Sequence, residues 1–185
     1  MKKSLNLIIG FLAICWISYL LSLWFPIQQY GIVPRQSVGL IGIVAAPFLH
    51  GSFTHLSGNS VSFAILMLIL SALEERQQFF KLFLMALLTG ILTWLMARNA
   101  VHIGASGLIF AIFGYLVLSG WFARRVRYVL VALLVIFLYG GMIYGVLPGK
   151  VGISWESHLF GFISGGFLSW YFHAKQRKGK RKAWL

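Results

Sequence analysis

The chain has 185 residues, of which 59% are hydrophobic and 10% are charged, and its mean hydropathy is +0.86. This composition lies far from that of a soluble globular domain and indicates a protein of the lipid bilayer. The net charge of +13 does not indicate a nucleic-acid partner, because the basic residues are not interleaved with aromatic residues along a soluble face. The lone cysteine, Cys15, permits no intramolecular disulfide.

Apolar runs of nearly the length of a membrane crossing follow one another along the chain. A helix needs roughly 20 apolar residues to span the hydrocarbon core. The runs predict an all-α membrane protein, a bundle of six transmembrane helices that forms a single domain over residues 1–185. They are Leu5–Phe25, Ser57–Leu73, Phe79–Ala97, Ser106–Phe122, Tyr128–Leu147 and Ser157–Phe172.

The first run and the connection after it need separate interpretation. The run has the basic start of a signal peptide, but it is longer than a typical apolar region of such peptides, so we expect a retained span. The connection Pro26–Thr54 is apolar and is interrupted by prolines and glycines. This pattern predicts a partly embedded loop between the first two helices, and it fits a flexible exterior loop poorly.

The distribution of basic residues predicts the orientation of the chain. If both termini lie on one side of the membrane, the basic residues on the other side are only Arg35, Arg98 and Lys150. The positive-inside rule then places both termini in the cytoplasm, and we expect a multi-pass protein of a bacterial inner membrane. The basic tail 174–185 is interpreted as a topology signal, with binding of anionic lipid headgroups as a second interpretation. The residues on the majority side are Lys2, Lys3, Arg76, Lys81, Arg124, Arg125, Arg127, Lys175, Arg177, Lys178, Lys180, Arg181 and Lys182.

Polar side chains open three of the predicted helices at the exterior end. The second helix carries His55, Asn59 and Ser62 at the spacing i, i+4, i+7, which places them on one face. Polar residues within a membrane are costly and by default face the bundle interior or water. Ser106 opens the fourth helix and His158 opens the sixth. A serine becomes nucleophilic when a base takes its proton, and histidine is the commonest such base.

Small residues predict that the fourth and sixth helices pack closely. Such residues let the backbones of membrane helices approach each other. Because His158 shares a face with the glycines of the sixth helix, it would point toward the fourth helix. Alone, each signal has a simpler explanation, since small pairs often serve packing only and a lone membrane serine usually bonds its own backbone. The small residues are Gly107, Ala111 and Gly114 on the fourth helix and Gly161 and Gly165 on the sixth.

Together, three segments resemble the rhomboid family of intramembrane serine proteases: residues 50–59 (HGSFTHLSGN), 104–107 (GASG) and 158–161 (HLFG) with Gly165. The resemblance implies that Ser106 is the nucleophile, that His158 is its general base and that His55 and Asn59 stabilise the oxyanion. It implies a structural role for His50. It further implies that single-span membrane proteins enter laterally from the bilayer and are cleaved near the exterior face through an acyl-enzyme.

The sequence departs from the pattern of many rhomboids at two places. Phe110 stands where many carry a tyrosine that packs on the catalytic histidine. The phenyl ring allows stacking on His158 but removes any hydrogen bond from a hydroxyl. The loop Pro26–Thr54 also lacks the Trp-Arg pair of many relatives, which leaves its anchoring open.

The acidic residues predict a Ser-His dyad rather than a triad. Only Glu156 lies near the exterior end, and it stands two residues before His158, so the two side chains do not face each other on a continuous helix. The remaining two, Glu74 and Glu75, lie at the cytoplasmic end.

Three alternatives to a protease fit the sequence less well. A non-catalytic rhomboid-like protein that binds membrane helices is disfavoured by the intact Ser106 and His158. A transporter or channel would predict inverted repeats and ionisable residues at mid-membrane, and the sequence shows neither. A metal site would have to use His50, His55, His102 and His158, but the only exterior carboxylate is that of Glu156 and no His-Glu-x-x-His pattern occurs, so we expect no metal and no cofactor. We expect His102 to be exterior and solvated and His173 to lie at the cytoplasmic end.

Overall fold

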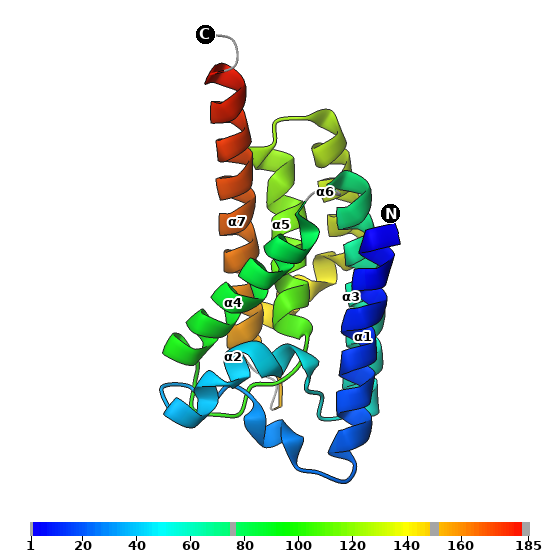
Figure 1. Ribbon diagram of the computed structural model, residues 1–185. Coiled ribbons are helices and arrows are strands. Elements are labelled where there is room, and N and C mark those ends of the chain that lie inside the picture. The colour runs from blue at the N-terminus through cyan, green and yellow to red at the C-terminus, as the bar shows by residue number, and fades with distance from the viewer. Residues whose placement is uncertain (1, 75–76, 149–151, 183–185) are drawn as a thin grey trace.

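The computed structural model describes residues 2–74, 77–148 and 152–182, with the backbone alone for 176–182 (Figure 1). Within these ranges the chain is helical, and an isolated antiparallel bridge pairs Ile32 with His102. Several basic residues counted for the orientation lie outside the described residues or side chains. They are Arg76, Lys150, Arg177, Lys178, Lys180, Arg181 and Lys182.

The long helices coincide with the predicted apolar runs, although their ends differ. By length and composition, four described segments are able to cross a membrane, namely residues 2–22, 53–73, 78–96 and 126–146. The helix at 106–122 is apolar but shorter. The long helices are α1 (Lys2–Ser22), α3 (Phe53–Leu73), α4 (Gln78–Met96), α5 (Ser106–Phe122), α6 (Val126–Tyr139) and α7 (Trp155–Lys182).

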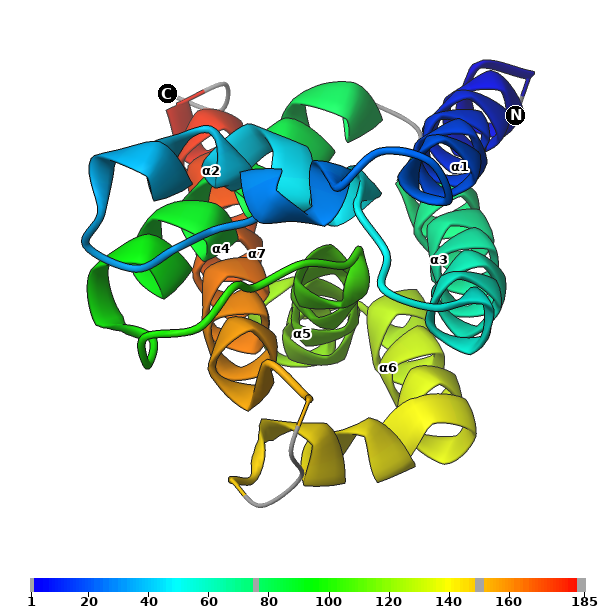
Figure 2. The same cartoon turned by 90° about the horizontal axis from the view of Figure 1, so that it is seen from below.

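Helix α5 occupies the centre of the bundle. The view along the helices shows α4, α7, α6 and α3 around it, with α1 packed outside α3 (Figure 2). Its residues 107–116 are all buried. Over these residues α5 is covered by protein on every side, so this part of the helix forms the core of the bundle.

The α5–α7 contact brings two backbones together. A Cβ atom added to Gly161 would overlap the carbonyl oxygen of Gly107, and one added to Gly165 would overlap that of Ala111. At Gly114 an added Cβ would stand 2.5 Å from the carbonyl oxygen of Phe162. Side chains at these positions would therefore force the two helices apart, as expected for small-residue packing between membrane helices.

The connection between α1 and α3 forms short helices rather than an irregular loop. Arg35 donates a hydrogen bond to the carbonyl of Ala97 at 2.7 Å, and the Trp94 indole donates to the carbonyl of Gln36 at 2.9 Å. These bonds tie the connection to the end of α4 and supply the anchoring that the sequence left open. The short helices are η1 (Ile27–Tyr30), η2 (Ser37–Leu40), α2 (Gly42–Ala45) and η3 (Ala46–Phe48).

Two predicted helix ends were wrong. The fifth run was expected to be helical through Leu147, but α6 ends at Tyr139 and continues as the 3-10 segment η4 (Gly140–Val146). Consecutive glycines, Gly140 and Gly141, weaken the α-helix at this point because glycine loses the most conformational entropy on ordering. The last helix continues past Phe172 to Lys182, since hydropathy marks only the apolar part of a helix.

A buried polar cluster lies at the opposite end of α5 from Ser106. The Lys81 ammonium group pairs with the Glu74 carboxylate, which also accepts a hydrogen bond from the Tyr115 hydroxyl at 2.8 Å. His173 lies 3.4 Å from the same carboxylate and 3.1 Å from the hydroxyl of Ser119. Lys81 was counted among the charges that set the orientation, but its side chain is 4% exposed and its charge is neutralised within the fold.

The α5–α7 contact leads to the first prediction. Gly161→Leu forces a side chain against the Gly107 carbonyl, so it should lower the midpoint of thermal unfolding by about 2–12 °C, given about 1–3 kcal/mol for overpacking. Gly58→Leu is the matched control, because a Cβ added to Gly58 meets no atom within 4 Å. Equal midpoints for both variants, measured in detergent, would contradict the packing described.

Candidate active site

Ser106 and His158 are brought into contact by the α5–α7 packing. The imidazole Nε2 of His158 lies 2.8 Å from the hydroxyl oxygen of Ser106, a hydrogen-bond distance. Ser106 is the first residue of α5, and His158 lies in the first turn of α7, one helical turn before Gly161. The close backbone approach at Gly161 therefore holds the imidazole against the start of the neighbouring helix.

The second ring nitrogen of His158 is oriented by a backbone carbonyl. Nδ1 lies 2.9 Å from the carbonyl oxygen of Gly145 in η4. A carbonyl can only accept, so Nδ1 carries the proton and Nε2 presents its lone pair to the Ser106 hydroxyl. The imidazole is also stacked on the ring of Phe110, with centroids 4.2 Å apart and planes 5° apart. The stacking expected from the phenylalanine is therefore present.

Glu156 forms an ion pair with Arg98. Its carboxylate is nearly buried and pairs with the Arg98 guanidinium at 3.1 Å, while Arg98 also donates to the carbonyl of Ile153 at 2.7 Å. Among the described contacts, the ring nitrogens of His158 face a hydroxyl and a carbonyl and no carboxylate. The Arg98–Glu156 pair instead ties the segment after α4 to the first turn of α7.

His55 and Asn59 lie beside the turn that precedes Ser106. A Cβ added to Gly104 would stand 2.7 Å from His55 Nε2 and 3.5 Å from Asn59 Nδ2, so both side chains crowd this residue. Gly104 also has a φ of +115°, which residues with side chains rarely adopt. The N–H groups of the first turn of α5 have no partners within that helix, and its dipole is positive at this end. Hydrogen-bond donors therefore lie beside Ser106.

His50 connects these donors to one another. It is 1% exposed, and its Nε2 accepts from the Asn59 amide at 3.0 Å and from the Ala105 N–H at 3.4 Å. Burial and the neighbouring His55 lower the pKa of His50 to about 4, so the ring is neutral near pH 7 and able to accept. One N–H of the Asn59 amide is engaged by His50, and among the described contacts the other N–H has no partner.

His102 was expected to be solvated, and this expectation was wrong. Its side chain is 2% exposed, with Nδ1 3.0 Å from the Ser154 hydroxyl and Nε2 3.0 Å from the carbonyl of Arg98. Its backbone pairs with Ile32, so the connection from α1 covers it. Burial lowers the pKa of His102. The metal site that the sequence disfavoured would have used His102, whose ring nitrogens both have hydrogen-bond partners here.

Sequence reasoning missed the Gly145 carbonyl and the contacts of Arg98 and His102. Nothing in the sequence identifies a backbone carbonyl that bonds a histidine 13 residues away. The pairing of Arg98 with Glu156 was accessible in principle, since both were placed at the exterior end and a charge near a membrane interior is costly without a partner.

Comparison with known proteins agrees with the resemblance seen in the motifs. A family model of the rhomboid domain matches residues 37–175, and the chain belongs to the rhomboid family. An uncharacterized protein of Mycobacterium tuberculosis is 32% identical over 159 residues, covering 81% of this chain and 66% of that protein. An uncharacterized protein of Mycobacterium leprae is 33% identical over 148 residues, covering 75% of this chain and 59% of that protein.

A plant relative carries a rhomboid name. "Rhomboid-like protein 11, chloroplastic" of Arabidopsis thaliana is 37% identical over 95 residues, which cover 48% of this chain and 33% of that protein. The chain spans less than two thirds of the length of each of these relatives. With its long apolar helices, membership of this family makes the chain an integral membrane protein.

Proposed function

We propose that this protein is an intramembrane serine endopeptidase that uses a Ser-His dyad. The observation that carries the proposal is the 2.8 Å contact between His158 Nε2 and the Ser106 hydroxyl, with Nδ1 committed to the Gly145 carbonyl. This arrangement pairs a nucleophile with a base in the correct tautomer. Membership of the rhomboid family supports a protease-type function of the same kind.

The proposed reaction begins when the Ser106 oxygen attacks the scissile carbonyl and its proton passes to His158 Nε2. The oxyanion that forms is stabilised by His55, Asn59 and the first-turn N–H groups of α5. Collapse of this intermediate breaks the C–N bond, and the leaving amine takes the proton from His158. Water then attacks the acyl-enzyme, with His158 again acting as the base. The Gly145 carbonyl orients the imidazole in the place where a triad has a carboxylate.

The proposed topology follows from which residues lie at each end of the bundle. The starts of α3, α5 and α7 share the end that holds the dyad, and the start of α1 and the end of α7 lie toward the other end (Figure 1). We propose that all six long helices cross the bilayer, that the termini are cytoplasmic and that the dyad lies near the exterior face of a bacterial inner membrane. Residues 1–185 then form one rhomboid-like domain whose basic tail, 174–185, lies in the cytoplasm.

The proposed substrates are single-span transmembrane proteins that reach the dyad from the surrounding lipid bilayer. A peptide bond within a transmembrane helix is protected by its own hydrogen bonds, so the substrate must unwind locally before attack. No nucleic acid and no cofactor enters this reaction scheme, since the nucleophile, the base and the oxyanion donors are all side chains or N–H groups of this chain.

Covalent labelling tests the nucleophile directly. We expect a fluorophosphonate probe to label the purified wild-type protein at Ser106, because only a serine with an adjacent base reacts readily. Labelling should be absent in Ser106→Ala and lost in His158→Ala, while Ser119→Ala should label normally. Labelling of Ser106→Ala at the wild-type level would disprove the assignment. A folded wild type that never reacts would favour a non-catalytic, helix-binding protein.

The oxyanion site gives a kinetic prediction. Asn59→Ala should lower kcat by roughly 10²–10³, the usual loss for one oxyanion donor, with a smaller change in KM. Ser62→Ala, on the same face of α3, is the control and should leave kcat near the wild-type value. Turnover of a reconstituted transmembrane substrate measures both. Similar kcat values for the two variants would show that Asn59 serves packing only.

The carboxylate of Glu156 provides the test of dyad against triad. Because Glu156 contacts Arg98 rather than His158, Glu156→Gln should retain at least about a tenth of the wild-type kcat. Loss of the carboxylate in a true triad costs about 10⁴ in kcat. The same turnover assay decides the matter, and a loss as large as that of Ser106→Ala would make the enzyme a triad protease.

A further inference from the structure

An apolar cavity of about 540 Å³ lies between α1, α4 and the connection that includes α2 and η3. It is separate from the dyad, since none of Ser106, His158, His55 and Asn59 lines it. Its lining is apolar except for Asn6 at the end where α1 begins. The volume lies within the range of about 300–1,000 Å³ that is usual for small-molecule sites.

The cavity has a buried back wall and an open apolar rim. At the back, Phe11 and Phe48 are in ring contact with centroids 5.1 Å apart, and Leu108 of α5 is buried. At the rim, Phe79 of α4 is 74% exposed and Val44 of α2 is 65% exposed. In a membrane protein such a rim faces acyl chains, so the cavity opens sideways into the bilayer.

The width of the cavity favours an acyl chain over a substrate helix as its occupant. An α-helix with its side chains is about 10–12 Å wide, so the cavity would hold only about one turn of a substrate helix. An unbranched acyl chain is thin and flexible enough to follow a crevice between two helices. Gly10 adds to the free space, because a Cβ atom placed on it would meet no atom within 4 Å.

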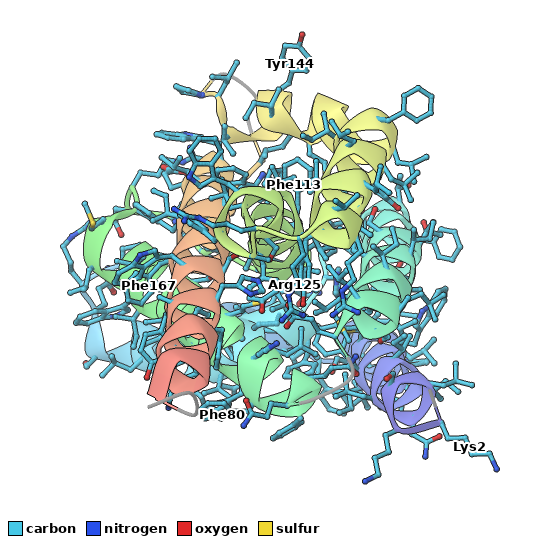
Figure 3. All side chains as sticks on the ribbon, turned by 90° about the horizontal axis from the view of Figure 1, so that it is seen from above. Lys2, Phe80, Phe113, Arg125, Tyr144 and Phe167 are labelled. Atoms are coloured by element: carbon cyan, nitrogen blue, oxygen red, sulfur yellow. The ribbon has the colours of Figure 1, made fainter. Side chains whose placement is uncertain are left out.

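Charge at one end indicates the headgroup. Lys2 and Lys3 are exposed and stand four and three residues before Asn6, so each is one helical turn from Asn6, whose face of α1 continues to Gly10. Lys2 projects outward at the edge of the molecule (Figure 3). Two ammonium groups above an apolar crevice complement a phosphate group attached to an acyl chain.

We propose that this cavity binds one acyl chain of an anionic phospholipid, with the headgroup held by Lys2 and Lys3. The bound chain fills the crevice between α1 and α4 and rests against Phe11 and Phe48. The site is independent of the proposed proteolysis. It would link the lipid composition of the membrane to the placement of the α1–α3 connection, whose residues form one wall of the cavity.

Photo-crosslinking in vesicles tests this site. The full chain is placed in phosphatidylcholine vesicles that contain a trace of phosphatidylglycerol with a diazirine in its acyl chain, and adducts are mapped by mass spectrometry. We expect adducts on the peptides that contain Phe11 and Phe48. Gly10→Phe should lower their yield about fivefold or more, whereas Ile9→Phe, whose neighbouring position faces away from the cavity, should not.

The headgroup contact is tested with matched lipids. A phosphatidylcholine probe with the same acyl chain should give a lower yield of adducts. Combining Lys2→Gln with Lys3→Gln should reduce the preference for the phosphatidylglycerol probe by about fivefold for each lysine at low salt. Equal yields for the two probes would overturn the anionic assignment. If Gly10→Phe elutes as an unfolded protein, Ala86→Phe is used in its place, because this substitution fills the cavity from α4.

Two further outcomes would overturn the proposal. The first is that adducts form at the cavity as often as on the exposed α6 residues Leu133 and Phe137, and that neither Gly10→Phe nor Ala86→Phe changes their yield. This result would show contact with bulk lipid only. Displacement of the probe by a synthetic leucine-alanine transmembrane peptide would assign the cavity to a helix. Neither outcome would alter fluorophosphonate labelling of Ser106, so the lipid site and the proposed protease activity are tested independently.

Discussion

The backbone contact between α5 and α7 is the constraint on which the rest of the structure depends. At Gly107 and Gly161, and again at Ala111 and Gly165, the helices approach until no side chain fits between them. Small residues make this possible in a bilayer, where the hydrophobic effect does not drive helices together and close packing must do so. The contact fixes the axial register of the two helices, and that register sets His158 opposite Ser106.

The segments around this contact hold the imidazole without a carboxylate. The chain leaves the α-helical path after Tyr139, and η4 carries the Gly145 carbonyl to Nδ1 of His158. From the other side, Phe110 stacks on the ring. Among the described residues, the acidic residue near this ring is Glu156, and it neutralises Arg98. A neutral acceptor orients the ring but does not stabilise an imidazolium as strongly as an anion does, so stacking and burial have a larger share in holding the base.

The two ends of α5 are polar in different ways. At the Ser106 end the helix presents unpaired N–H groups and neighbouring donors, with His50 accepting from both Asn59 and Ala105. At the other end Glu74 is paired with Lys81 and contacts Tyr115 of α5. Buried charges are tolerated when they are paired and hydrogen-bonded, and removal of one partner leaves the other uncompensated. The polar groups at the second end thus contact one another as ion pairs and hydrogen bonds.

The sequence by itself determined the family, the helical class and the approximate place of each long helix, because hydropathy and residue spacing are local properties. It also indicated Ser106, His158, His55 and Asn59 as a group, since polar residues inside a membrane need a reason to be there. Only the tertiary structure decided what surrounds them. The bond from the Gly145 carbonyl to His158, the cover of His102 by Ile32 and Ser154, and the contact of Tyr115 with Glu74 each join separate segments of the chain, and no local pattern encodes such a contact.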